Sequence, residues 1–375
     1  MNSILNETIS LPSEIFDVPY GSQFIRLSWR ELLIATIAIL ILCISIPPIW
    51  SQFEPIQFGP DYRIPYRESN DYWLYERYCN SQNSNGEIRV VGDSVVWGEY
   101  VSPDQTLSHC LSETTGSPFC NMGVNGTHPL ALEGLLQYYS KFNAGEKVIL
   151  HFNPLWISSP RHDLQITKEF AFNHPKLVPQ FDVQIPCYRA DFSDRFSIVF
   201  ERTVPFMRWV NHLRVAYFNN LDFPSWSIEH PYTDPFIENI DIFEPSRQLR
   251  HNPIPWTESG IQKQDFDWIN LQTSLQWAAF KRTVTRLREQ EVSVVVFVGP
   301  FNEHLLTESS LHTYQKLISE ISSELSDENI PFWIPEALPS SLYADSSHPL
   351  HEGYNMMAQH MMQNKLFQQW IQREG

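Results

Sequence analysis

The sequence predicts an α/β protein whose doubly wound parallel sheet follows a single transmembrane helix. Residues 291–298 form a continuous apolar run, which is the pattern of a strand buried on both faces of a parallel sheet. Strand and helix patterns alternate elsewhere, with strands predicted at 88–91, 147–152 and 331–334 and helices at 128–141, 306–326 and 352–372. A separate apolar segment near the N-terminus predicts the transmembrane helix.

Length and charge narrow the classes of protein to consider. The 375 residues suffice for one large domain with an appendage, or for two domains. Hydrophobic residues make up 42% of the chain and charged residues 18%, so we predict a folded core rather than disorder. The net charge of −17 and the lack of any Lys/Arg cluster argue against a nucleic-acid partner. Such a surface repels anionic lipids and polymers and tolerates neutral substrates.

Residues 32–50 contain no charged side chain and are mostly apolar. These nineteen residues, at a rise of about 1.5 Å each, come close to the ~30 Å of a bilayer's hydrocarbon core. Arg26 and Arg30 precede the run and no basic residue follows until Arg63, which predicts an N-terminus inside and a C-terminal part outside. Two alternatives stay open: a buried core helix, and a signal peptide, although no small-residue cleavage site follows the run.

We therefore divide the chain into four parts. Residues 1–30 are predicted to be cytoplasmic, 31–50 to form the transmembrane helix, and 51–85 to form a stalk that packs on the domain. Residues 86–375 form the main domain, with an irregular insertion at about 160–265 that acts as a lid or a loop-rich subdomain. The protein is thus predicted to be a single-pass membrane protein with a periplasmic or extracellular C-terminal domain.

Five cysteines bear on the compartment. Cys43 lies inside the apolar run, where a cysteine behaves as a small apolar side chain. The other four, which are Cys79, Cys110, Cys120 and Cys187, lie on the predicted outer side, where disulfides form. Four cysteines allow three pairings, and a Cys110–Cys120 bond, which closes a short loop, is the first to test. Four unpaired buried thiols are the open alternative.

The first candidate for chemistry is Ser94. It follows Gly92 and Asp93 directly after the predicted strand 88–91, with Gly98 four residues further on. A serine at a tight junction of strand and helix exposes its hydroxyl at the carboxyl edge of the sheet, where the sites of α/β proteins lie. Its backbone N–H lies near a helix N-terminus, which favours developing negative charge.

A second candidate group is far away in the sequence. Serine is a weak nucleophile at neutral pH and needs a base within hydrogen-bond reach. His348 offers an imidazole whose ordinary pKa of ~6.5 suits that role. Asp345, three residues earlier, is placed to bond the other ring nitrogen and to fix the tautomer. We therefore predict a Ser-His-Asp arrangement of Ser94, His348 and Asp345.

These motifs resemble those of the SGNH (GDSL-type) hydrolase superfamily. Gly92-Asp93-Ser94, the Gly-Val-Asn-Gly block at 123–126 and Asp345-Ser346-Ser347-His348-Pro349 carry the resemblance. It implies a flavodoxin-like three-layer α/β/α sandwich, with Ser94 as nucleophile, His348 as base and Asp345 as the orienting acid. It also implies an oxyanion hole formed by the N–H groups of Ser94 and Gly126 and the side chain of Asn153, whose neighbours His151, Phe152 and Pro154 depart from the usual pattern.

Three functions follow from these residues. The preferred hypothesis is a membrane-anchored serine esterase or O-acyltransferase, acting with an acetyl group on a cell-surface carbohydrate or similar ester. Its expected partners are that ester and the lipid bilayer through residues 31–50, and no nucleic acid. The alternatives are a non-catalytic polysaccharide-binding or assembly protein with an esterase-like fold, and a lysophospholipase or lipase. We predict no metal or cofactor, because His348 and His351 have no convincing third ligand nearby.

Overall fold

The computed structural model describes residues 27–54, 56–82, 86–238 and 249–372. The chain divides into two compact units, Met1–Phe53 and Glu54–Gly375, and each is described by itself. The predicted cytoplasmic segment lies almost entirely outside the described residues, as do parts of the predicted stalk and insertion. The limits of the predicted domains stay predictions.

The first unit contains one long apolar helix, α1, Trp29–Phe53. By length and composition this helix is able to cross a membrane, and its apolar side chains, such as Ile34, Ile39 and Ile44, are exposed. The exposure contradicts the alternative of a buried core helix, because a core helix covers its apolar side chains. An exposed apolar helix at this position is consistent with a signal anchor or a signal sequence.

The second unit is built on a parallel sheet, as the sequence predicts. Within the described residues the sheet has five strands in the order β2-β1-β3-β4-β5, and every pair is parallel. This is the flavodoxin-like order of a doubly wound fold. The strands are β1 Ile88–Gly92, β2 Phe119–Gly123, β3 Lys147–Phe152, β4 Ser293–Val298 and β5 Phe332–Trp333.

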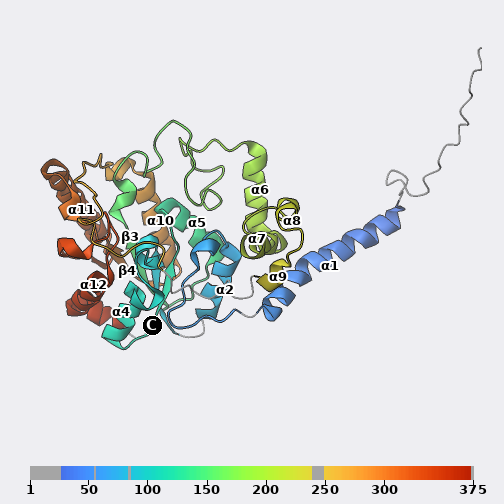
Figure 1. Ribbon diagram of the computed structural model, residues 1–375, viewed down its shortest axis with the longest axis horizontal. Helices are drawn as coiled ribbons and strands as arrows, with labels where there is room; N and C mark the ends of the chain where they lie inside the picture. The colour runs from blue at the N-terminus through green and yellow to red at the C-terminus, as the bar shows by residue number, and fades with distance from the viewer. Residues whose placement is uncertain (1–26, 55, 83–85, 239–248, 373–375) are drawn as a thin grey trace, which may run out of the picture. The chain divides into compact units, whose positions relative to one another are not determined.

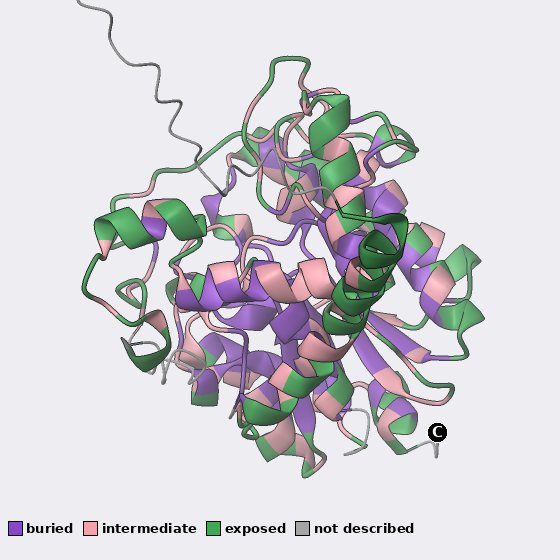
Figure 2. Ribbon diagram, turned by 90° about the vertical axis from the view of Figure 1, so that its right-hand side faces the viewer, coloured by how far each residue is buried: buried purple, intermediate pink, exposed green. Residues whose placement is uncertain are grey.

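Helices cover both faces of the sheet and complete three layers. On one face Phe152 of β3 packs against Trp277 and Phe280 of α10 (Leu275–Glu289), which also contacts α5 (Pro129–Tyr139). On the other face Ile149 belongs to a core cluster that contains Met357 of α12 (His351–Gln363), and α12 contacts α4 (Leu107–Thr115). Successive side chains of a strand point to opposite faces, so apolar residues of both parities are buried here. Figure 2 shows the buried residues gathered in the strands and on the inward sides of the helices.

The remaining helices of the second unit include several in the insertion. Figure 1 shows α6, α7, α8 and α9 at one end of this unit and α11 and α12 at the other. The described helices are α2 Tyr72–Gln82, α3 Ser94–Trp97, α4 Leu107–Thr115, α5 Pro129–Tyr139, α6 Phe192–Thr203, α7 Pro205–Tyr217, α8 Phe223–Glu229, α9 Pro235–Glu238, α10 Leu275–Glu289, α11 Glu308–Asp327, α12 His351–Gln363 and α13 Lys365–Gln372. The insertion is therefore more regular than predicted. Helix α6 ends at Thr203, and Pro205 begins α7, where its missing N–H costs no helical hydrogen bond.

Several elements differ from the predicted pattern. Strand β2 was not predicted, because its five residues, Phe119–Gly123, mix apolar and polar side chains. Helices α4 and α10 were also absent from the prediction. The helix predicted at 352–372 is two helices, because Asn364 ends α12 and its side chain accepts the N–H groups of Leu366 and Phe367 at the start of α13.

The predicted stalk, 51–85, begins within α1, but from Glu54 on it belongs to the second unit, and its described residues supply part of that unit's core. Tyr72, Leu74, Tyr75, Tyr78 and Cys79 of α2 are all buried. The cysteines take the unpaired alternative: all five lie in the described ranges, and none forms a disulfide. Burial raises the pKa of Cys79 to about 11 and of Cys110 to about 12, so both thiols stay protonated and unreactive at neutral pH.

Candidate active site

Ser94 occupies the predicted junction between β1 and a helix. Strand β1 ends at Gly92, Asp93 caps α3 by accepting the N–H of Val95 at 2.9 Å, and Ser94 is the first residue of α3. Gly92 is required at this junction, because a Cβ there would lie 2.6 Å from Cγ2 of Val96 and 2.8 Å from Cβ of His151. The serine is therefore held at the carboxyl edge of the sheet by a turn that excludes a side chain at position 92.

Helix α3 is only four residues long, and buried side chains from elsewhere hold it in place. Arg63 stacks on the ring of Trp97 and donates to the carbonyls of Trp97 at 2.6 Å and Gly98 at 2.7 Å. Tyr354 of α12 donates to the carbonyl of Val95 at 2.6 Å. A cation at the C-terminal end of a helix is favourable for the helix dipole. These contacts fix the backbone that carries Ser94.

The structure brings the three predicted catalytic residues together. Nε2 of His348 lies 2.8 Å from Oγ of Ser94, and Nδ1 of His348 lies 2.8 Å from both carboxylate oxygens of Asp345. The Asp345 carboxylate also accepts the N–H groups of Ser347 at 2.9 Å and of His348 at 3.0 Å. Because the carboxylate accepts the proton on Nδ1, Nε2 is left as the acceptor for the serine hydroxyl. The orientation needed for general-base activation of Ser94 is present.

Nearby carboxylates set the protonation of this group. Burial alone lowers the pKa of His348, but the charges of Asp345, Asp93 and Glu99 outweigh it and raise the pKa to about 8. Burial acts the other way on Asp345, whose pKa nevertheless falls to about 2 because His348 and two backbone N–H groups stabilise the carboxylate. The aspartate is thus ionised at every physiological pH and stabilises the imidazolium that forms when His348 takes a proton.

Asp93 of the Gly-Asp-Ser motif is the centre of a second, buried network. Its carboxylate accepts from Nδ2 of Asn153 at 2.9 Å and from Nε1 of Trp156 at 2.8 Å, and His151 lies 3.2 Å away. Burial opposes ionisation, yet His151 and the hydrogen bonds from the Val95 N–H and the Asn153 side chain lower the pKa of Asp93 to about 2. Sequence reasoning did not assign Asp93 a role. The structure shows that it joins the turn after β1 to the loop after β3.

The contacts of Asn153 differ from those of an oxyanion donor. Nδ2 of Asn153 donates to Asp93 and lies 3.2 Å from Oγ of Ser347, and Oδ1 accepts the N–H of Leu155. An amide nitrogen has two hydrogens, and both have acceptors here. Asn153 therefore positions Asp93 and the loop that carries His348. Its contact with an oxyanion stays a prediction, because Nδ2 would have to give up one of these two hydrogen bonds to donate to the oxyanion.

Gly126 lies on the loop after β2, at the same edge of the sheet as Ser94. Its φ is +73°, and a Cβ there would lie 2.5 Å from Nδ2 of Asn173, so only glycine fits without strain. Among the described residues neither the Gly126 N–H nor the Ser94 N–H has a hydrogen-bond acceptor. Both amides are therefore available to a ligand oxygen, as the predicted oxyanion hole requires.

Four side chains that the sequence did not single out stand beside the triad. Glu99 accepts from Nη1 of Arg250 at 2.6 Å, from Nε2 of His251 at 2.8 Å and from the side-chain amide of Asn125. The ring of Tyr100 lies 5.7 Å from the ring of His348 and 5.2 Å from that of His251. The closeness of Glu99 and Tyr100 to Ser94 in the sequence could have predicted that they lie near the site. Nothing in the sequence around Arg250 and His251 indicated their place beside it.

His351, considered as a partner of His348 for a metal, has another contact. It begins α12, and its Nε2 lies 3.0 Å from Nδ2 of Asn355. Within the described ranges no group of three or more His, Cys, Asp or Glu side chains is arranged to hold a metal ion.

The raised pKa of His348 predicts the pH dependence of any acyl transfer at this site. The base must be neutral to accept a proton, so kcat/KM is expected to rise with pH through a midpoint of about 8. At pH 7 only about one tenth of the imidazole is neutral. The measurement is the pH profile of aryl acetate hydrolysis by the full-length protein in detergent.

A variant links this midpoint to the neighbouring charge. Glu99→Gln removes one carboxylate that raises the pKa of His348, so the midpoint is expected to move to lower pH. Glu320→Gln, on the exposed side of α11, is the matched control and should leave the midpoint in place. An unchanged midpoint in Glu99→Gln would contradict this electrostatic account.

Comparisons with known proteins add the following. No protein-family model matches the chain, and no curated protein sequence matches it. Among solved structures the chain is similar to a protein assigned to the lipolytic proteins of the G-D-S-L family from Desulfitobacterium hafniense DCB-2. The two sequences are 11% identical, the match covers 74% of this chain and 99% of the other, and the TM-score is 0.35. At that score the likeness carries no argument about chemistry, which depends on the site geometry given above.

Proposed function

We propose that the protein is a membrane-anchored serine esterase or O-acyltransferase that acts, through an acetyl group, on a cell-surface carbohydrate or similar ester. The observation that carries this proposal is the continuous chain of hydrogen bonds from Ser94 through His348 to Asp345. The anchor in the proposal is the exposed apolar helix α1.

The proposed reaction is a double displacement. Oγ of Ser94 attacks the ester carbonyl carbon while its proton passes to Nε2 of His348, and the carbonyl oxygen becomes an oxyanion facing the N–H groups of Ser94 and Gly126. When this intermediate collapses, the alcohol leaves with the proton from His348, and the acyl group stays on Ser94. Water or a sugar hydroxyl then attacks the acyl carbon and gives its proton to His348. As this second intermediate collapses, His348 returns the proton to Oγ of Ser94, which leaves as the free hydroxyl. An esterase uses water, and an acyltransferase uses the hydroxyl.

A fluorophosphonate probe tests the nucleophile directly. Full-length protein in detergent is expected to be modified at Ser94, as mapped by peptide mass spectrometry, because this probe reacts with serines activated by a neighbouring base. Asp345→Asn should slow the labelling, since the imidazole loses the carboxylate that orients it.

The chain offers a matched control for this labelling. Oγ of Ser158 also lies 2.8 Å from a histidine ring nitrogen, Nδ1 of His162, but Ser158 is fully buried and burial lowers the pKa of His162. Ser158→Ala should therefore leave the labelling intact. Folded protein that stays unlabelled at Ser94 would refute the proposed function.

A second candidate, a lipase or lysophospholipase, has one observation in its favour. Phe192, Phe196 and Phe200 lie at four-residue spacing on α6, and all three are exposed. An apolar row of this kind suits an acyl chain or a lipid surface. Faster turnover of long-chain esters than of acetyl esters by the labelled enzyme would favour this candidate over the acetyl esterase.

A further inference from the structure

A cavity of about 360 Å³ lies in the first part of the insertion, along residues 169–194. Its volume falls in the range of roughly 300–1,000 Å³ that is typical of small-molecule sites. The lining combines aromatic and charged side chains, chiefly Phe170, Phe172, Tyr188, Glu169, Arg189 and Asp194. The candidate active site does not include any of them.

We propose that this cavity binds one or more rings of a neutral sugar chain and so holds the carbohydrate on which Ser94 acts. The proposal rests on the proposed function for its connection with acyl transfer, but the binding itself does not require the chemistry. The argument depends on the aromatic rings, the charged groups and the position of the cavity.

The aromatic rings of the cavity are held by neighbouring side chains. The Tyr188 hydroxyl donates to Oε1 of Gln180 at 2.9 Å, and the guanidinium of Arg195 stacks 4.4 Å from its ring centre. Phe172 meets Tyr188 edge to face, with ring centres 5.5 Å apart. A fixed aromatic face binds the C–H face of a sugar ring with little loss of side-chain entropy.

The charged groups decide between a sugar and an acyl chain. The carboxylates of Glu169 and Asp194 have no hydrogen-bond or ion-pair partner in the described part of the chain, while Arg189 donates to the carbonyl of Thr167 at 3.0 Å. Ionised carboxylates are strong acceptors for the hydroxyl groups of a sugar. An acyl chain in the same place would desolvate these charges without replacing their hydrogen bonds. An anionic polymer is disfavoured, because the two carboxylates and the net charge of −17 would repel it.

A row of packed aromatic rings joins the cavity to the candidate active site. Trp156, which donates to Asp93, has its ring 5.7 Å from His128, and the His128 ring lies 5.8 Å from Phe172 of the cavity. Three successive rings therefore connect the motif that carries Ser94 with the cavity.

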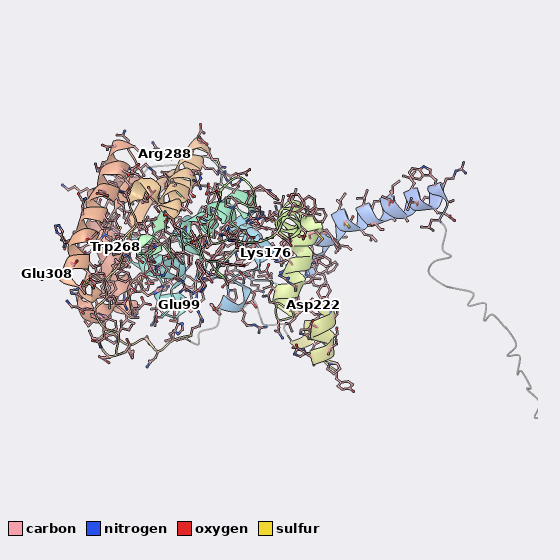
Figure 3. All side chains as sticks on the ribbon, turned by 90° about the horizontal axis from the view of Figure 1, so that it is seen from above. Glu99, Lys176, Asp222, Trp268, Arg288 and Glu308 are labelled. Carbon is pink, nitrogen blue, oxygen red and sulfur yellow. The ribbon has the colours of Figure 1, made fainter. Side chains whose placement is uncertain are left out.

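A second connection runs through the residue after Phe172. The amide of Asn173 is the group that a Cβ at Gly126 would meet at 2.5 Å, and the carbonyl of Asn173 lies 3.2 Å from Nε2 of His128. The backbone that forms the cavity thus passes directly beside the predicted oxyanion turn. Figure 3 labels one residue near each site: Glu99, five residues after Ser94, and Lys176, next to the cavity residue Pro175. In this view both lie between Glu308 and Asp222.

A larger cavity of about 410 Å³ does not share this position. Its lining includes Gly86, Ser117, Glu146 and Lys147, which lie at the amino ends of β1, β2 and β3. Ser94 lies at the opposite, carboxyl edge of the same strands. A polymer bound there would be remote from the serine.

Direct binding to full-length protein carrying Ser94→Ala tests the proposal, because the probe is not consumed. The probes are cellohexaose, xylohexaose and chitohexaose, measured by isothermal titration calorimetry and saturation-transfer NMR in detergent. At least one is expected to bind, and Tyr188→Ala in the same background is expected to raise its Kd by about tenfold or more.

Two further variants keep the test decisive. Glu169→Gln changes an exposed side chain, so it should weaken binding without affecting folding even if Tyr188→Ala unfolds the domain. Tyr232→Ala removes a fully exposed tyrosine of the insertion that does not line the cavity, and it should leave the Kd unchanged. No binding of any probe, or equal Kd values for the cavity variants and the parent, would overturn the proposal.

The failure of this proposal and that of the proposed function are distinguishable. Sugar binding without fluorophosphonate labelling of Ser94 leaves the cavity as a binding site on a non-catalytic protein. Labelling of Ser94 without sugar binding leaves a serine esterase whose substrate is held elsewhere. Displacement of a bound oligosaccharide by palmitate would assign the cavity to an acyl chain and would count against the sugar.

Discussion

Ser94→Ala is expected to lower kcat/KM for 4-nitrophenyl acetate by about 10⁴-fold or more. The substitution removes the only atom that forms the acyl-enzyme in the proposed mechanism, and it leaves the buried turn around Gly92 and Asp93 unchanged. The measurement is steady-state hydrolysis by full-length protein in detergent, with folding checked by circular dichroism.

A second variant separates a loss of nucleophile from a general loss of the site. When two residues act in the same catalytic step, removing either one abolishes that step. The double variant Ser94→Ala/His348→Ala should therefore lower kcat/KM little more than Ser94→Ala alone. Separate, multiplying losses would indicate that His348 contributes independently of Ser94. A Ser94→Ala protein that keeps most of its activity would end the esterase proposal.

His212→Ala is expected to lower the free energy of unfolding of the second unit by about 3–5 kcal/mol, because it leaves two buried carboxylates without their shared cation. His212 is fully buried, its Nδ1 lies 2.6 Å from Oδ2 of Asp71, and its Nε2 lies 2.8 Å from Oε1 of Glu54. Arg77 pairs with the same glutamate. The measurement is urea unfolding of the full-length protein in detergent, followed by tryptophan fluorescence.

The charge of His212 also predicts a pH dependence of this stability. Burial lowers the pKa of His212, but Asp71 and Glu54 overcome it and raise the pKa to about 9, above the unfolded value of ~6.5. A raised pKa in the folded state means that the stabilisation is fully present below about pH 6.5 and is lost as the pH rises through about 9. The difference in unfolding free energy between the wild type and His212→Ala should therefore shrink between these values.

An exposed ion pair serves as the control. Lys316 lies 3.7 Å from Glu320 on α11, and Lys316→Ala should change the free energy of unfolding by no more than about 0.5 kcal/mol. A change in His212→Ala as small as that of Lys316→Ala would show that the buried carboxylates find other partners when the imidazole is removed.

Local patterns carried much of the prediction. The run at 291–298 is β4 with its start moved to Ser293, and the segment predicted at 147–152 is β3 with the same bounds. A strand buried on both faces needs apolar side chains of both parities, and that need is visible in the sequence itself. The order of the motifs was enough to propose Ser94, Asp345 and His348, which the fold then places within hydrogen-bond distance.

Short or mixed elements were beyond the reach of the same patterns. In β2, Asn121 is buried, and its side chain donates to the carbonyl of Val96 in α3. A polar residue at this position hides the strand from a search for apolar runs, although the side chain lies in the interior. The helices of the insertion have exposed apolar residues, as in α6, so their periodicity does not identify a buried face.

By itself, the sequence determined the α/β class and the apolar N-terminal helix, because those features are patterns of neighbouring residues. It also predicted Ser94, His348 and Asp345 as site residues, from short local motifs. Only the tertiary structure decided that Asn153 bonds Asp93, that His212 joins Asp71 to Glu54, and that Phe172 lies next to His128. Each of these contacts joins residues at least 40 positions apart. These contacts form only when particular faces of the sheet and helices pack together. That packing leaves no periodic pattern of residues in the sequence from which it could be predicted.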